Sequence, residues 1–397
     1  MTSTTHESGV DVSASRKERA LGWWSVVGVL MQLELRQRLR TTRWKATLGI
    51  AFVVLAVAVF GSMYIAMISG GASYRDWARN LYAIVMAAEL FFGIILAPTL
   101  TATAINGDRK DATLALVQAT PISNRQLVVG KLAGNWVSCL ALVAISSPFL
   151  IWGMIAAPYG IAIGLLGVVV LCLLFACYGG IGLGFSALTA RPAGSAVLTQ
   201  ATVFFLILGL PALFGLFYTT TSQEHQVVRG KYAYPARSSE PGISPTKEPV
   251  CHDVEQTETF YHTEHIWWLL APNPFLILPD VVAEHDNPVS NNNSWIAGQR
   301  PTDPTIMTPI SQMLSRARAG PYINAPRCHE SMARYTTDPT DYRTFYQAQN
   351  AHAKSRVGDS WPVGLLVNAV FGFIGVFVAA RRLRVPAGKL PKGTRIA

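Results

Sequence analysis

Two polar side chains stand out because they lie inside long apolar stretches of the chain. Glu89 lies about a third of the way into one such stretch, and Asn368 lies in the middle of another. A carboxylate inside a bilayer is costly, so an intramembrane glutamate is a functional candidate by default. We predict that Glu89 and Asn368 contribute to a substrate path. The alternative for Glu89 is that it faces a watery outer vestibule or pairs with a neighbouring helix.

A second group of candidates is the charged cluster that opens the polar stretch 105–131. This stretch reads INGDRKDATLALVQATPISNRQLVVGK and interrupts an otherwise apolar region. We predict a short amphipathic helix at Ala112–Ala119, because Thr120-Pro121 follows and proline disfavours helix in the residue before it. A second short helix, Asn124–Lys131, leads into the next apolar stretch. A helix–break–helix between two spans is suited to receive movement from a partner.

A third group is the pair Cys251 and Cys328, the only cysteines of the large polar segment 219–360. In an oxidising compartment two such cysteines form a disulfide. Two unpaired thiols are the alternative.

Histidines His252, His262 and His265 also lie close together in that segment. A metal site needs three or four convergent ligands. Sequence spacing does not ensure that convergence, so we predict no metal site.

The composition is that of a membrane protein. Hydrophobic residues make up 50% of the chain, charged residues only 14%, and the mean hydropathy is +0.30; soluble domains carry roughly 25% charged residues. The formal net charge is +10, but segment 219–360 holds 12 Lys/Arg against 15 Asp/Glu. The basic excess therefore flanks the apolar stretches, which is the positive-inside pattern and argues against nucleic acid as a partner.

Six apolar stretches are long enough to cross a hydrocarbon core of about 30 Å as helices. We predict an all-α polytopic membrane protein with six transmembrane helices, an N-terminal interfacial helix and a large extracytoplasmic insertion before the last helix. The predicted spans are Ala46–Ser69, Leu81–Ala104, Leu132–Ala157, Ile161–Leu188, Ala196–Tyr218 and Trp361–Ala380. Basic clusters before the first span, after the second, after the fourth and after the sixth place both termini in the cytoplasm.

The remaining parts of the chain are predicted from composition. Polar residues 1–15 are expected to form a disordered tail, and basic amphipathic residues 16–45 a cytoplasmic helix in the membrane interface. Transmembrane helices one to five occupy 46–218. Segment 219–360 shows no sustained helical or alternating period over most of its length, so it is either a functional cap or partly disordered. Three further predictions complete the chain: a re-entrant or interface-lying element at 265–282, transmembrane helix six at 361–380 and a basic cytoplasmic tail at 381–397.

The sequence contains no phosphate-binding loop of the form GxxxxGK[ST]. The glycine-rich run Gly179–Gly184 has no preceding strand and no Lys-Ser/Thr, so we interpret it as close helix packing. Lys131, in GKLAG, lacks the upstream glycine and the following hydroxyl. We therefore expect no ATPase activity and no cofactor in this chain.

Taken together, Asp108-Arg109, Ala112-Thr113-Leu114, Thr120-Pro121-Ile122-Ser123 and Gly130-Lys131 resemble the pattern of ABC-2 type transporter permeases. The run Gly184–Val197, the interfacial helix and the six spans are similar to that family as well. Asp108 departs from the family's usual glutamate, and Asp111-Ala112 stand where glycine is expected.

The resemblance implies a permease subunit of an ABC exporter in a bacterial plasma membrane. Two permease copies, identical or related, would form the path among membrane lipids. Separate nucleotide-binding subunits would bind ATP and Mg and dock below. The resemblance implies a docking and coupling surface made of Asp108, Arg109, Thr113, Leu116, Thr120, Pro121 and Arg125.

Two other function classes remain open. One is a membrane-anchored extracytoplasmic sensor or binding protein, although six glycine-rich spans exceed what anchoring needs. The other is an intramembrane enzyme, which would need more ionisable residues in the spans than Glu89 alone. The sequence does not choose a substrate.

Overall fold

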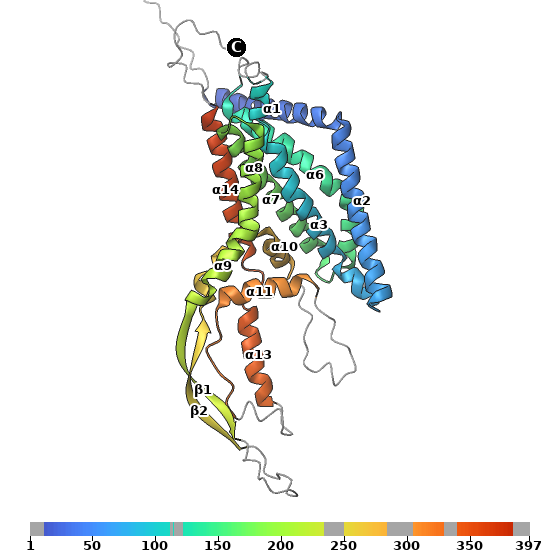
Figure 1. Cartoon of the computed structure of the whole chain (residues 1–397). Helices are drawn as coiled ribbons and strands as arrows, with labels where there is room; N and C mark the ends of the chain where they lie inside the picture. The colour runs from blue at the N-terminus through green and yellow to red at the C-terminus, as the bar shows by residue number, and fades with distance from the viewer. Residues whose placement is uncertain are drawn as a thin grey trace, which may run out of the picture. The chain divides into compact units, whose positions relative to one another are not determined.

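The computed structural model describes residues 12–111, 114, 122–233, 250–283, 305–328 and 340–383 (Figure 1). The chain divides into two compact units, one of Met1–Phe204 with Leu365–Ala397 and one of Phe205–Gly364. Each unit is described by itself below.

Six helices within the described residues are long and apolar enough to cross a membrane. They are Thr42–Ser69, Tyr74–Lys110, Asn124–Ala156, Gly160–Leu188, Pro192–Thr221 and Trp361–Arg382. The prediction of an all-α polytopic membrane protein with six spans is confirmed.

The first unit consists of helices alone within its described residues. Its elements are α1 (Val12–Leu39), α2 (Thr42–Tyr64) with the π-helical turn η1 (Ile65–Ser69), α3 (Tyr74–Ala102), α4 (Asn106–Lys110), α6 (Asn124–Ala156), α7 (Gly160–Leu188), α8 (Pro192–Phe204) and most of α14 (Trp361–Arg382). Figure 1 shows α3, α6 and α7 side by side, and α3 packs against both of the others.

Several helix boundaries differ from the predicted ones. The predicted helix 16–45 is broken, because Thr41 is extended and residues from Thr42 onward already belong to α2. The second span begins at Tyr74 rather than Leu81. Ser73 and Asp76 form a capping box there, with the Asp76 amide donating to Ser73 Oγ over 3.2 Å, and this cap satisfies amides of the first turn.

Glycines bring the backbones of α7 and α14 into contact. A Cβ on Gly180 would lie 2.5 Å from the carbonyl oxygen of Gly372, and one on Gly184 would lie 2.7 Å from the Cα of Gly375. Small residues at such crossings let helices pack closely in a membrane. The run Gly179–Gly184 therefore packs helices, as the sequence indicates.

The second unit contains helices and a β-hairpin. Its elements include the π-helical turn η2 (Phe205–Gly209), α9 (Leu210–Tyr218), β1 (Ser222–Ala233), β2 (Val250–Tyr261), α10 (Pro274–Ala283), α11 (Met307–Ala319) and α13 (Thr340–Lys354). The strands are antiparallel, with Ser222 opposite Tyr261 and Arg229 opposite Val254 (Figure 1). Segment 219–360 thus has regular structure that its sequence did not predict.

The predicted element 265–282 forms a 3-10 turn, Trp267–Leu269, followed by α10. Asp280 on α10 is fully buried, and its carboxylate accepts from the Ser311 hydroxyl at 2.6 Å and from the Ser360 and Trp361 amides at 2.9 Å. A buried carboxylate with these donors fixes α10 within the unit. Its re-entry into a membrane stays a prediction.

Candidate functional site

An ion-paired lysine connects three helices of the first unit. Lys131 Nζ on α6 lies 2.7 Å from Glu34 Oε1 on α1 and 2.7 Å from Asp108 Oδ2 on α4. The Lys131 side chain is only 8% exposed, against 17% for Glu34 and 29% for Asp108. A buried ammonium needs such partners, because an unpaired buried charge is strongly unfavourable.

The close approach of α1 and α6 explains how Glu34 reaches Lys131. A Cβ on Gly130 would lie 2.6 Å from the Cβ of Leu30, and one on Gly134 would lie 2.6 Å from the Cβ of Glu34. Glycines four residues apart therefore form a groove on α6 that receives α1.

One turn further along, Arg38 on α1 donates to the side-chain oxygen of Asn135 on α6. Burial lowers the pKa of Arg38, and the neighbouring Glu34 opposes that shift. Glu34 and Arg38 are thus spaced by one helical turn, as are Lys131 and Asn135. This complementary spacing is the signal in the sequence for the contact between α1 and α6, which was not predicted.

Helix α4 is also fixed to the end of α7. The amides of Ile105 and Asn106 donate to Ser186 Oγ over 3.0 and 3.2 Å, and Arg109 donates to the carbonyl oxygen of Ala187 over 3.4 Å. Asn106 Nδ2 lies 3.4 Å from Thr189 Oγ1. Contacts with α6 and α7 therefore hold the start of the polar stretch in place.

Apolar packing joins the same elements. Leu114, in the middle of the polar stretch, is buried in one cluster with Leu30 of α1, Ile105, and Leu127 and Val128 of α6. The start of α6 is fixed by a capping box between Ser123 and Gln126. We call the set Glu34, Asp108, Leu114 and Lys131 the α1–α4–α6 junction. Movement of residues 105–131 would be transmitted to α1 and α6 through this junction.

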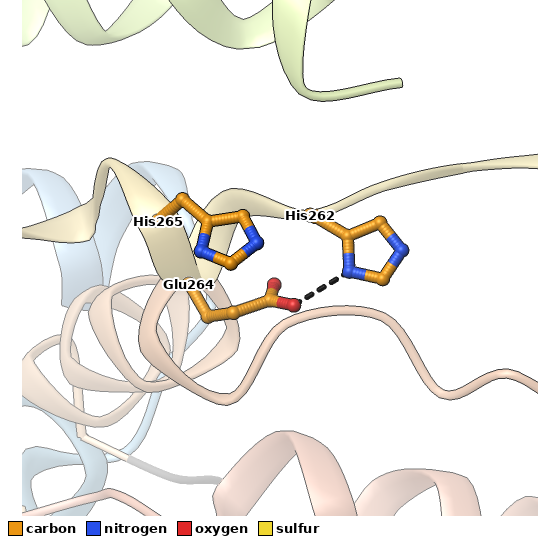
Figure 2. Close-up of side chains that lie close together, drawn as sticks. All are labelled: His262, Glu264 and His265. Atoms are coloured by element: carbon orange, nitrogen blue, oxygen red, sulfur yellow. Dashed lines mark hydrogen bonds and ion pairs between the residues drawn. The ribbon is translucent and has the colours of Figure 1, made fainter. Parts of the chain in front are cut away.

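A separate group of ionisable side chains gathers where the hairpin of the second unit ends. His262 Nδ1 lies 2.6 Å from Glu264 Oε1, and His262 Nε2 lies 2.9 Å from His225 Nε2 on β1. Figure 2 shows His262, Glu264 and His265 facing a common space. One ligand atom from each of these three lies within 4.8 Å of the others.

Comparison with known proteins decides the family. The model of the ABC-2 family transporter proteins matches residues 29–262, more than half of the chain. The chain belongs to the ABC-2 family of transporters. No curated protein matches it. As an ABC-2 protein it is a multi-pass membrane permease of an ABC transporter, and this family supplies the transmembrane subunit rather than the ATPase.

The coupling residues predicted for this ABC-2 protein are described only in part. Thr113, Leu116, Thr120 and Pro121 lie outside the described residues. Asp108 forms an ion pair with Lys131, and Arg109 donates to the carbonyl oxygen of Ala187. Arg125 is exposed at the start of α6, where it lines a cavity of about 410 Å³. The aromatic side chains of that cavity are Trp23, Phe373 and Phe377.

The two predicted path residues of the ABC-2 protein are both buried. Glu89 on α3 is 4% exposed, and Asn368 on α14 is fully buried. Their contribution to a substrate path stays a prediction.

The cysteine pair of the second unit is a disulfide. Cys251 on β2 is joined to Cys328, with Cα atoms 5.6 Å apart. Next to it, the Gly230 amide donates to the Pro326 carbonyl over 3.0 Å and the Cys328 amide donates to Asp253 over 2.7 Å. The segment before Cys328 is therefore bound along the hairpin of this ABC-2 protein.

Proposed function

We propose that this ABC-2 permease exports its substrate with ATP hydrolysed by a separate nucleotide-binding subunit that also holds Mg. The whole sequence lacks a phosphate-binding loop, so the energy source must be a partner. A second permease copy, identical or related, completes the path, and membrane lipid surrounds the exposed apolar faces of spans such as α2 and α7.

The α1–α4–α6 junction carries this proposal. Lys131 contacts both α1 and α4, and Leu114 is buried between them and α6. A subunit that pushes on residues 105–131 would therefore shift α6 and α1 together. Coupling requires a packed element with two discrete arrangements, one favoured by each nucleotide state. Asp108, Arg109, Thr113, Leu116, Thr120, Pro121 and Arg125 form the proposed docking and coupling surface.

The proposed orientation places both termini and residues 105–131 in the cytoplasm of a bacterial cell and segment 219–360 outside its plasma membrane. The basic clusters support this orientation. The Cys251–Cys328 bridge supports it too, because disulfides persist in oxidising compartments.

A membrane-anchored sensor or binding protein is the second candidate. The observation that favours it is a cavity of about 440 Å³ in the second unit, whose aromatic lining includes Phe214, Tyr218, Phe260 and Tyr322. Such a cavity would also serve an exporter as an outer substrate site. A partner ATPase distinguishes the two candidates.

The test is purification of the full chain from its native membrane in mild detergent, followed by identification of bound subunits and measurement of ATP hydrolysis. We expect a co-purifying subunit that contains GxxxxGK[ST] and hydrolyses ATP. Recovery of the intact chain without any such subunit, together with retained ligand binding by the second unit, would favour the sensor.

A further inference from the structure

The side chains at the end of the hairpin in the second unit have the chemistry of a metal site. His262, Glu264 and His265 come from five consecutive residues, YHTEH, at the end of β2 and in the 3-10 turn Thr263–His265. Two imidazoles and a carboxylate are ligands that suit borderline divalent metals such as Zn²⁺. From the geometry we infer that these three side chains bind one such ion.

The distances are close to those of a bound site. Ligand atoms about 2 Å from a shared zinc ion lie roughly 3–4 Å from one another. The three ligand atoms here lie within 4.8 Å of one another. His265 is exposed, so its ring is free to rotate toward the buried His262 and close the remaining distance.

The hydrogen bond between His262 and Glu264 leaves the second oxygen of the Glu264 carboxylate without a partner in the part of the chain that the structure describes. Glu264 Oε1 contacts His262, but Oε2 is buried and has no hydrogen-bond partner among the described residues. A buried carboxylate oxygen without a partner is unfavourable. A cation between Glu264 and the two imidazoles satisfies it.

His225 supplies the outer contact that metal-binding histidines require. A ligating imidazole usually donates its other ring N–H to an acceptor, which fixes its tautomer. With the ion on Nδ1 of His262, the proton of that ring lies on Nε2, which is 2.9 Å from His225 Nε2. His225 then accepts this hydrogen bond and carries its own proton on Nδ1.

The backbone around Glu264 is also shaped for this carboxylate. Gly320 follows α11 with a positive φ of 73°, and a Cβ there would lie 2.6 Å from the carboxyl carbon of Glu264. The glycine therefore lets the carboxylate approach the end of α11. Thr263 and Gly320 also line the cavity of about 440 Å³, so a bound ion would fix one wall of that cavity.

The test is calorimetric titration of ZnCl₂ into the full chain, purified through a tag without histidine and treated with a chelator. CoCl₂ reports coordination through its visible absorption spectrum. We expect a single Zn²⁺ per chain and a four- or five-coordinate Co²⁺ spectrum. Glu264→Gln and His265→Ala should abolish both. His225→Phe should weaken binding by about 10–100-fold, as for other outer partners of ligating histidines.

His252→Ala is the matched control, because His252 is exposed on β2 opposite Lys231 and outside the group. It should bind Zn²⁺ like the unmodified chain. Retention of the Cys251–Cys328 disulfide and of the thermal unfolding transition shows that each variant is folded. The inference is overturned if the unmodified chain binds no Zn²⁺, or if folded Glu264→Gln and His265→Ala bind it unchanged.

Discussion

The Lys131 ammonium lies 2.7 Å from the Asp108 carboxylate and joins the start of the polar stretch to α6. Glu34 on α1 contacts the same ammonium at 2.7 Å. The Lys131 ammonium thus joins α6 to both α1 and α4, the helices that the proposed partner subunit would move.

Replacing Lys131 should destabilise the first unit. Lys131→Met removes the ammonium that both Glu34 and Asp108 contact, and breaking a fully buried pair costs about 3–5 kcal/mol. Because Asp108 is 29% exposed, we expect a loss of about 2–3 kcal/mol, seen as a lower thermal unfolding temperature in detergent. Lys110→Met, at the exposed last residue of α4, is the control and should change little. Equal effects of the two substitutions would contradict the buried ion pairs.

Adding a methyl group between α7 and α14 should also be unfavourable. Gly180→Ala places a Cβ 2.5 Å from the Gly372 carbonyl oxygen, and overpacking of this kind costs about 1–3 kcal/mol. Gly194→Ala, where no atom lies within 4 Å, should leave stability unchanged or raise it by roughly 0.5–1 kcal/mol. Thermal unfolding of both variants measures the difference, and a stable Gly180→Ala protein would show that the helices do not touch there.

The disulfide and the orientation of the chain are tested together by thiol labelling. A membrane-impermeant reagent applied to intact cells should label Cys251 and Cys328 only after reduction. Cys139, Cys172 and Cys177, which lie in the spans, should stay unlabelled. Labelling before reduction would exclude the bridge, and labelling only in inverted vesicles would reverse the orientation. Cys251→Ser should destabilise the second unit by about 2–4 kcal/mol.

The hairpin should lose part of its stability in acid. Arg229 hydrogen-bonds to Glu258 at 2.5 and 2.9 Å, and this contact lowers the pKa of Glu258. A carboxyl with a depressed pKa stabilises the folded state above its unfolded pKa, about 4.5, and this contribution is lost as pH falls through the lower folded value. The side chains are partly exposed, so the effect should be below about 1 kcal/mol.

Amide hydrogen exchange of β1 and β2 measures this contribution when the unmodified chain is compared with Glu258→Gln at each pH. The intrinsic exchange rates then cancel. Protection should be greater in the unmodified chain at pH 7, and this difference should shrink as the pH falls below about 4.5. A difference that does not change with pH would show that Glu258 titrates no differently in the two states.

The six spans could be predicted from the sequence because hydropathy and length alone define them. The predicted boundaries of the spans were less accurate where a helix extends beyond its apolar residues. Residues 74–80 carry Arg75, Asp76 and Arg79, so they were excluded from the second span, although the Ser73–Asp76 cap begins the helix before them. The hairpin was missed because SQEHQVVRGKYA is polar on both faces. Among the described side chains of this strand only Val227 is buried, at 6% exposed, so the strand shows no alternation.

The candidate site could be predicted only where its residues are neighbours in sequence. Asp108 and Arg109 were found because they form a local motif. Glu34 lies 97 residues from Lys131, and that contact depends on how α1 packs against α6. For the same reason HTEH was not expected to form a metal site. Sequence spacing gives the pair of histidines, but the convergence of Glu264 with them and the outer contact from His225 depend on the folded hairpin.

Site-specific photo-crosslinking in native membranes tests the central claim most directly, that an ATPase subunit acts on residues 105–131. A photoreactive phenylalanine analogue at position 116 or 125 should give a crosslinked product containing a GxxxxGK[ST] peptide, and ATP should change its yield. The same analogue at Trp268, exposed in the second unit, should give none. Crosslinking to the ATPase from position 268, with none from 116 or 125, would contradict the account.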